Sequence, residues 1–189
     1  MITSTGNAQV KHLLQLRQKR KVRDQGGVFI VEGNKMFEEA PPDDIQKVYV
    51  SETFYNKKKN NISLKGYKVQ VLSDSLFAHV SDTKTPQGIL CVVKQRRYGL
   101  QEILTRKNPH IIVLDTLQDP GNVGTIVRTA EGAGVTGIIM SKACVDMYNP
   151  KTIRSTMGSI YRMPFIMWRS WRIYFMILKR EISPHMRHI

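Results

Sequence analysis

The sequence has 189 residues, enough for one domain or two small ones, and a formal net charge of +14. Such a charge favours a polyanionic partner such as nucleic acid, although a solvated basic surface would also account for it. No apolar run is long enough to span a membrane, and the polar start MITSTGNAQ is unlike a signal peptide. Cys91 and Cys144 lie in apolar stretches without metal-ligand spacing. We therefore expect a cytoplasmic protein with reduced thiols, no metal and no membrane partner.

The N-terminal half alternates between helix and strand patterns. Strands are predicted over 28–31, 47–50, 68–72 and 88–94, and helices over 7–25, 35–40 and 74–80, with a polar loop over 55–61. This alternation predicts an α/β domain over residues 1–95. The basic, polar segment 96–108 precedes a proline and is typical of a linker.

Late in the first predicted helix lies a group of five cations: Arg17, Lys19, Arg20, Lys21 and Arg23. Cations near a helix C-terminus interact favourably with the helix dipole. Five within seven positions exceed what this interaction needs, so we predict that they contact RNA phosphates. A solvated cationic face is the alternative.

The segment LDTLQDPGNVGTIVRTAEGAG, residues 114–134, joins a strand predicted over 111–114 to one over 137–140. Its apolar residues recur at helical spacing, so the pattern indicates a β-α-β unit, with residues 119–124 as the loop entering the helix. Ligands of open α/β sheets bind at this edge. Asn122 can cap the helix, Arg128 offers donors for phosphate or carboxylate, and Glu131 can pair with Arg128. An ordinary cap and a surface cation are the alternative reading.

Two further motifs bear on function. The run GAGVTG over 132–137 matches the dinucleotide fingerprint G-x-G-x-x-G, but it ends a helix instead of opening one, which disfavours a nucleotide-binding enzyme. The segment NPKTIRSTMGSIYRMPF, residues 149–165, predicts a turn, a short helix and a strand. Its Arg154 and Ser155 suit the wall of a polar pocket, although a plain amphipathic helix would also carry them.

The segments DTLQDPGNVGTIVRTAEGAG and NPKTIRSTMGSIYRMPF resemble the first and second motifs of the SpoU (TrmH-type) RNA ribose 2'-O-methyltransferases. VFIVEGNKMFEEA and SDTKTPQGILCVV resemble that family's N-terminal substrate-binding domain. The resemblance implies an S-adenosylmethionine-dependent homodimeric enzyme that acts on ribosomal or transfer RNA. It also implies an α/β fold, with a ribosomal-protein-like domain followed by an α/β-knot (SPOUT) methyltransferase domain. By matched position, Asn122, Arg128 and Glu131 would be catalytic-site residues, and Arg154 and Ser155 would contact RNA in the same site.

The family's third motif, which supplies most of the cofactor pocket, has no match in this sequence, so no cofactor-binding residue is assigned. We expect a partial methyltransferase domain over 109–166. The tail 167–189 has both tryptophans within four residues and no clean period. We interpret this tail as the product of a reading-frame shift in preference to a basic end that grips RNA. The chain as written is expected to bind RNA weakly and S-adenosylmethionine negligibly, and to transfer no methyl group. A non-catalytic RNA-binding protein is the alternative function.

Overall fold

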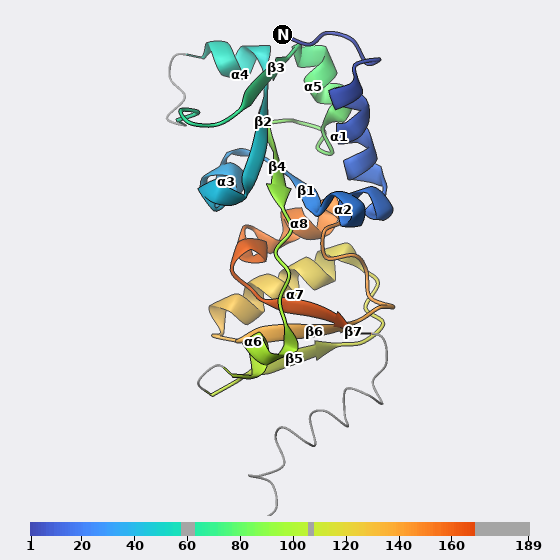
Figure 1. Ribbon diagram of the computed structural model, residues 1–189, viewed down its shortest axis with the longest axis vertical. Helices are drawn as coiled ribbons and strands as arrows, with labels where there is room; N and C mark the ends of the chain where they lie inside the picture. Colours follow the sequence, from blue (N-terminus) through green and yellow to red (C-terminus); the bar gives the residue numbers. More distant parts are fainter. Residues whose placement is uncertain (58–62, 106–107, 169–189) are drawn as a thin grey trace, which may run out of the picture.

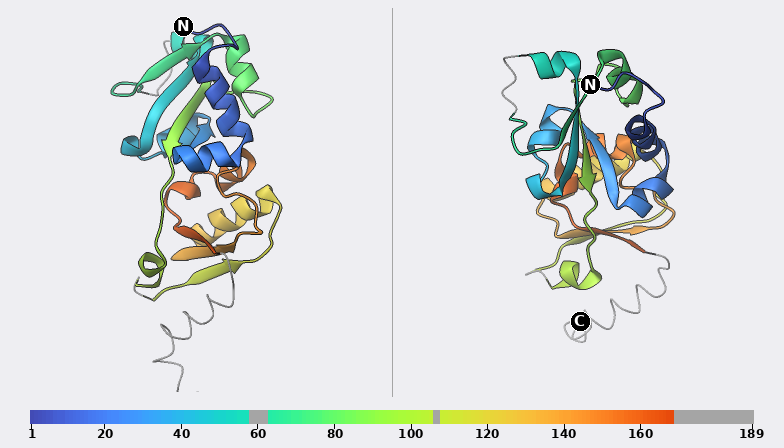
Figure 2. Two further views of the ribbon diagram at one scale, coloured as in Figure 1. Left: turned by 45° about the vertical axis from the view of Figure 1, so that its right-hand side comes forward. Right: turned by 45° about the horizontal axis from the view of Figure 1, so that its top comes forward.

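The computed structural model describes residues 1–57, 63–105 and 108–168. Two α/β units lie one above the other along the long axis of the molecule (Figure 1). The chain leaves the first unit at the end of one strand and descends along the second unit to its far side (Figures 1 and 2). The expected α/β fold class is confirmed. The expected knot depends on segments outside the described residues.

The N-terminal unit is built on a four-stranded sheet in the order β1-β4-β2-β3. β4 runs antiparallel to both of its neighbours, whereas β2 and β3 are parallel. α1 and α5 cover one face through fully buried side chains such as Leu13 and Phe77, and α3 packs on the other face. The bounds are α1 Ala8–Gln18, α2 Arg20–Gly26, β1 Val28–Glu32, α3 Asn34–Glu38, the 3-10 helix η1 Pro42–Asp44, β2 Ile45–Ser51, α4 Glu52–Asn56, β3 Val69–Leu72, α5 Asp74–Val80 and β4 Ile89–Lys94.

The helix predicted over 7–25 is broken in two at Lys19, which has an extended backbone between α1 and α2. The break turns α2 back under the end of α1. Arg23 on α2 can then donate a hydrogen bond from Nη1 to the carbonyl oxygen of Leu16, at 2.6 Å. A terminal carbonyl of α1 thus gains a partner, which local spacing could not reveal.

The second unit is a parallel three-stranded sheet in the order β5-β6-β7. α7 and α8 cover the face toward the N-terminal unit (Figure 1), and α6 packs on the other face. Two residues assigned to the aberrant tail, Met167 and Trp168, belong to β7 and pair with Met140 and Ser141. The regular strand therefore extends past the boundary expected at 166. The bounds are α6 Leu100–Leu104, β5 Ile111–Leu114, α7 Pro120–Gly132, β6 Gly137–Ser141, α8 Pro150–Thr156, the 3-10 helix η2 Ser159–Tyr161 and β7 Phe165–Trp168.

The segment expected to be a linker contains α6, which is part of the second unit. Ile103 of α6 is fully buried against Gly137 at the start of β6. A Cβ at Gly137 would lie 2.5 Å from Ile103 Cγ2, so only glycine leaves room for this contact. Part of the predicted linker therefore closes the free face of the second sheet.

One hydrophobic core runs through both units. It includes Phe29 and Met36 of the N-terminal unit together with Val127, Ile153 and Tyr161 of the second. Sequence patterns assign apolar residues to elements but not to a shared core, so two separately packed domains were expected. In the described ranges, no helix has the length and hydropathy needed to cross a membrane.

Candidate functional site

The start of α7 lies at the carboxyl edge of the second sheet. Asp119 is the N-cap, and its Oδ1 accepts a hydrogen bond of 2.7 Å from the backbone N–H of Asn122. Pro120 occupies the first helical position, where its missing N–H costs nothing. The prediction that Asn122 caps the helix is therefore wrong, and the helix begins earlier than expected. The side chain of Asn122 is left exposed at this edge.

The loops that follow β5 and β6 are joined to each other at the same edge. Thr116 N–H donates to Ser141 Oγ at 3.1 Å, and Val145 N–H donates to the Leu117 carbonyl at 2.9 Å. Thr116 adopts φ of 56°, an unusual backbone conformation for a β-branched residue. The two loops thus form one connected surface at the position where α/β sheets bind ligands.

α7 and α8 touch through Gly124. A Cβ at this position would lie 2.4 Å from Ser155 Cβ and 2.6 Å from the Thr152 carbonyl oxygen, so the helix backbones approach at glycine distance. Arg128 lies one helical turn beyond Gly124 and therefore on the same side of α7. This contact brings the region of Arg128 next to Ser155, as the two sequence motifs predicted.

The Arg128 side chain is exposed. Across residues 1–57, 63–105 and 108–168, it makes no hydrogen bond or ion pair. Its predicted partner Glu131 is bound elsewhere: Arg162 donates to it through Nε and Nη2, and also donates from Nη1 to Glu39 Oε2 at 2.9 Å. The predicted pairing of Glu131 with Arg128 is therefore wrong. The guanidinium of Arg128 is left available for an external anion.

The hydrogen bonds from Arg162 hold the pKa of Glu131 below its ordinary value. A carboxylate with a lowered pKa contributes stability above its unfolded-state pKa, and that stability is lost as pH falls through the folded-state pKa. Glu131→Gln is expected to lower the free energy of unfolding by about 0.5–1 kcal/mol at pH 7, since Arg162 is 48% exposed. The difference should shrink toward zero below about pH 4, where the native carboxyl is also neutral. Urea unfolding at pH 7, 5 and 3.5 measures it.

The matched control for this prediction is Glu38→Gln. Glu38 is exposed on α3 and makes no ion pair within the part of the chain that the structure covers. Its variant should differ little from the native chain at any of the three pH values. A stability loss in Glu131→Gln that stays constant down to pH 3.5 would contradict the electrostatic explanation.

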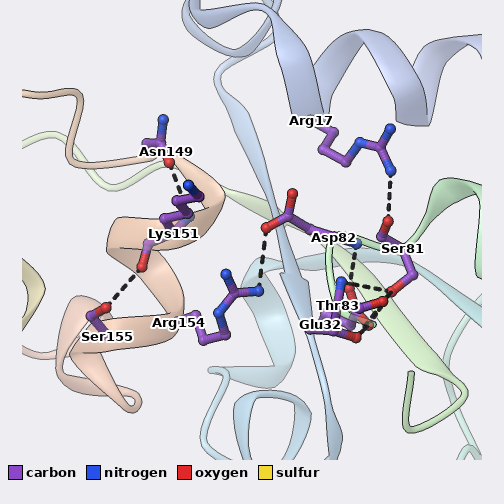
Figure 3. A network of polar contacts seen from close by, with 9 residues as sticks. All are labelled: Arg17, Glu32, Ser81, Asp82, Thr83, Asn149, Lys151, Arg154 and Ser155. Carbon is purple, nitrogen blue, oxygen red and sulfur yellow. Dashed lines mark hydrogen bonds and ion pairs between the residues drawn. The ribbon is translucent and has the colours of Figure 1, made fainter. Parts of the chain in front are cut away.

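Arg154 and Ser155 are neighbours on α8 but face different surroundings. Ser155 is half-buried against Gly124 of α7, and its Oγ donates to the Lys151 carbonyl at 3.0 Å. Arg154 points away from α7 to the N-terminal unit, where its Nη1 donates to Asp82 Oδ2 at 3.2 Å (Figure 3). The structure therefore places only Ser155 beside α7, and Arg154 at the junction of the two units.

The cationic cluster near the N-terminus is divided by the fold. Lys19, Arg20 and Lys21 are exposed, whereas Arg17 is half-buried and donates to the carbonyl oxygen of Ser81 at 2.6 Å. Arg23 is buried in an ion pair with Asp146, so it is withdrawn from the residues predicted to contact RNA. Its sequence neighbours gave no sign of this partner.

A cleft of about 420 Å³ runs along β7, close to the exposed cations of α2. Arginines and aromatic residues share its lining. This combination is typical of surfaces that bind single-stranded nucleic acid. The contributing arginines and aromatic residues are Arg20, Arg96, Arg97, Tyr98, Tyr148, Phe165 and Trp168.

The fold and this site define a two-domain α/β protein of the RNA-methylase class. Residues 7–91 match the MRM3-like substrate binding domain, and residues 109–185 match the SpoU rRNA Methylase family. The second match extends into the segment interpreted as out of frame. The chain therefore consists of an MRM3-like substrate-binding domain and a SpoU methylase domain.

Individual relatives agree with this assignment. The chain is 30% identical over 167 residues to the 23S rRNA (guanosine(2553)-2'-O)-methyltransferase RlmP of Bacillus subtilis, covering 87% of this chain and 64% of that protein. It is 31% identical over 174 residues to human rRNA methyltransferase 3, mitochondrial, covering 88% of this chain and 41% of that protein. The AdoMet-bound rRNA methyltransferase of Sinorhizobium meliloti superposes with a TM-score of 0.76 at 28% identity, covering 95% of this chain and 67% of that one. The chain thus spans less than two thirds of both of these relatives.

Proposed function

We propose that the chain carries the RNA-binding domain and part of the methyl-transfer site of an S-adenosylmethionine-dependent rRNA ribose 2'-O-methyltransferase. The observation that carries the proposal is α7. Its exposed Asn122 and unpaired Arg128 lie at the ligand-binding edge of a SpoU methylase domain. Ribosomal RNA is preferred over transfer RNA as the substrate because both curated relatives named above are rRNA methyltransferases.

When bound, S-adenosylmethionine supplies an electrophilic methyl group for transfer to the ribose 2'-oxygen. Its donor groups suit the carboxyl edge of the sheet, where the connected loops after β5 and β6 would line it. The chain's own residues must align the 2'-hydroxyl and ease its loss of a proton. Arg128 stays protonated at any working pH and so cannot act as the base. It instead donates hydrogen bonds to an RNA phosphate and to the 2'-oxygen as negative charge develops there.

Asn122 and Glu131 have different parts in this proposal. The amide of Asn122, exposed in the first turn of α7, can donate to and accept from a ribose hydroxyl. Glu131 holds Arg162, which links α7 to the segment after η2 and to Glu39 of the N-terminal unit. Glu131 therefore acts through the packing of α7 and not through a bond to Arg128.

A fusion protein tests the function, because no third motif is found in this sequence. Residues 1–166 would be joined to the C-terminal part of the Bacillus subtilis relative and incubated with ribosomal RNA and tritiated S-adenosylmethionine. We expect tritium at a ribose 2'-oxygen, mapped by reverse-transcription stops at low nucleotide concentration. The 189-residue chain, assayed in parallel, should bind RNA but show no methyl transfer. It should also show no saturable cofactor binding in calorimetry.

Each outcome of this experiment separates the alternatives. A fusion that binds RNA without methylating it would contradict the proposed reaction and favour a non-catalytic RNA-binding protein, a reading that the charge of +14 also supports. Saturable micromolar binding of S-adenosylmethionine by the 189-residue chain would show that its pocket is complete. In that case the interpretation of the tail as out of frame would be wrong.

We further propose that the complete enzyme is a cytoplasmic homodimer. Two buried free thiols, Cys91 and Cys144, suit a reducing compartment, and burial raises the pKa of the Cys91 thiol, which lowers its reactivity. Val113 of β5 is a large apolar side chain left 46% exposed, which suits a face covered by further protein. Sedimentation of the fusion and fractionation of the host cell test these two points.

A further inference from the structure

The two units meet at a groove between residues 81–87 of the N-terminal unit and α8 of the methylase domain, here named the junction groove (Figure 3). A cavity of about 250 Å³ opens there. Polar side chains dominate its lining, together with the exposed Met157. The lining residues used below are Glu32, Lys35, Thr83, Gln87 and Arg154.

The loop that forms one side of the groove is held rigidly. The carboxylate of Glu32 accepts hydrogen bonds from Ser81 Oγ, from Thr83 Oγ1 at 2.6 Å and from the backbone N–H of Asp82 at 3.0 Å. Arg17 adds a bond to the Ser81 carbonyl. These bonds occupy both oxygens of Glu32 and fix the backbone of Asp82. The Asp82 carboxylate is left pointing across the groove at Arg154 (Figure 3).

The ion pair between Asp82 and Arg154 is of the exchangeable kind. One bond of 3.2 Å joins the two side chains, which are 32% and 48% exposed. Exposed pairs of this type contribute little to stability. A guanidinium recognises carboxylate and phosphate with the same donors. The Asp82 carboxylate therefore stands where an external phosphate oxygen could bind.

The charges around the groove favour an anion. Lys35 is exposed, with Glu39 as its partner at 3.6 Å, and Lys84 is exposed on the loop itself. Against these cations and Arg154 stand Glu32, which is already fully hydrogen-bonded, Glu39, which is engaged by Arg162, and Asp82. Displacing Asp82 alone would free Arg154 in a positive environment.

We propose that the junction groove binds a backbone phosphate of the substrate RNA, with Arg154 exchanging Asp82 for that phosphate. The inference rests on the proposed function and specifies where the RNA enters. Ser155, the next residue on α8, packs against Gly124, one turn from Arg128. An RNA strand held at Arg154 thus reaches the methyl-transfer surface across the width of one helix. Asp82 occupies the groove until RNA arrives.

The test is a double-mutant cycle on the 189-residue chain, read out by the anisotropy of a fluorescent single-stranded 20-nucleotide RNA over a salt series. Asp82→Asn should raise affinity about two- to fivefold, the equilibrium cost of first breaking an exposed ion pair. It should also steepen the slope of log affinity against log salt by about 0.7, the value for one added phosphate contact on a single strand. The same change in an Arg154→Gln background should give no such gain.

Glu52→Gln is the matched control, because it removes one exposed negative charge on α4, at the far end of the N-terminal unit (Figure 1). An equal gain from Glu52→Gln and Asp82→Asn, or a gain that persists in the Arg154→Gln background, would overturn the exchange. RNA binding that does not respond to Asp82→Asn would overturn it while leaving the proposed function standing. Failure of every variant to bind RNA would overturn both.

Discussion

Arg23→Ala is expected to destabilise the folded chain by about 3–5 kcal/mol, the cost of breaking a buried ion pair by removing one partner. Arg23 and Asp146 have side chains only 4% and 12% exposed, and Arg23 Nη2 lies 2.6 Å from Asp146 Oδ2. Arg23 Nη1 also donates to the carbonyl oxygens of Leu16 and Arg17. The alanine variant would leave the Asp146 carboxylate desolvated without a cation and a helix end without its donor. Urea unfolding followed by far-ultraviolet circular dichroism measures the loss.

Two further variants separate burial from charge. Arg20→Ala removes a cation of the same helix whose pair with Asp24 is exposed, so it should cost under about 1 kcal/mol. The double variant Arg23→Met with Asp146→Leu should be more stable than Arg23→Ala, since no unpaired charge remains buried. Equal losses in Arg23→Ala and Arg20→Ala would show that the pair does not hold the two units together.

Arg128→Ala is expected to lower kcat/KM for methyl transfer by the fusion protein about 10²–10³-fold, the usual loss when one donor to a developing negative charge is removed. The fold should be unaffected, because Arg128 is exposed and pairs with no residue within the described ranges. Arg128→Lys should recover only part of the rate, because an ammonium keeps the charge but loses the planar fork. Initial rates on ribosomal RNA, with the thermal midpoint of each variant measured in parallel, test the expectation.

The control for Arg128 is Thr129→Ala, which truncates the next exposed residue of α7 and should leave the rate near that of the parent. A near-parental rate for Arg128→Ala would remove this residue from the site. A loss of rate accompanied by a large fall in the thermal midpoint would instead assign it a structural role.

Local patterns predicted the elements that build the methylase site. The apolar run over 111–114 is β5 with the same bounds, and the pattern of Val123, Val127 and Ala130 gave the buried face of α7. These features depend on periodicity and branching within a few residues. The same holds for α5, whose bounds coincide with the predicted 74–80.

The errors concern partners that are distant in sequence. Arg23 looked like a phosphate ligand because Asp146, its partner 123 residues away, could not be inferred from neighbouring residues. Glu131 lies at helical spacing from Arg128, but a stronger contact to Arg162 takes its carboxylate. The local rule for Asn122 failed for a different reason, since Asp119 and Pro120 offered an equally good helix start three residues earlier. In each case two local readings competed and the tertiary fold selected one.

Two buried tyrosines join the units through their hydroxyl groups. Tyr161 Oη donates to the Met36 carbonyl at 2.8 Å, and Tyr148 Oη donates to the Arg96 carbonyl at 2.9 Å, with rings packed in the shared core. Burial raises the pKa of both phenols, so these donors keep their protons throughout the physiological range. With a common core and such ties, the recognition unit and the catalytic unit are held at a constant separation. The protein would then work as a molecular ruler, choosing its ribose by how far that nucleotide lies from the RNA feature gripped at the other end.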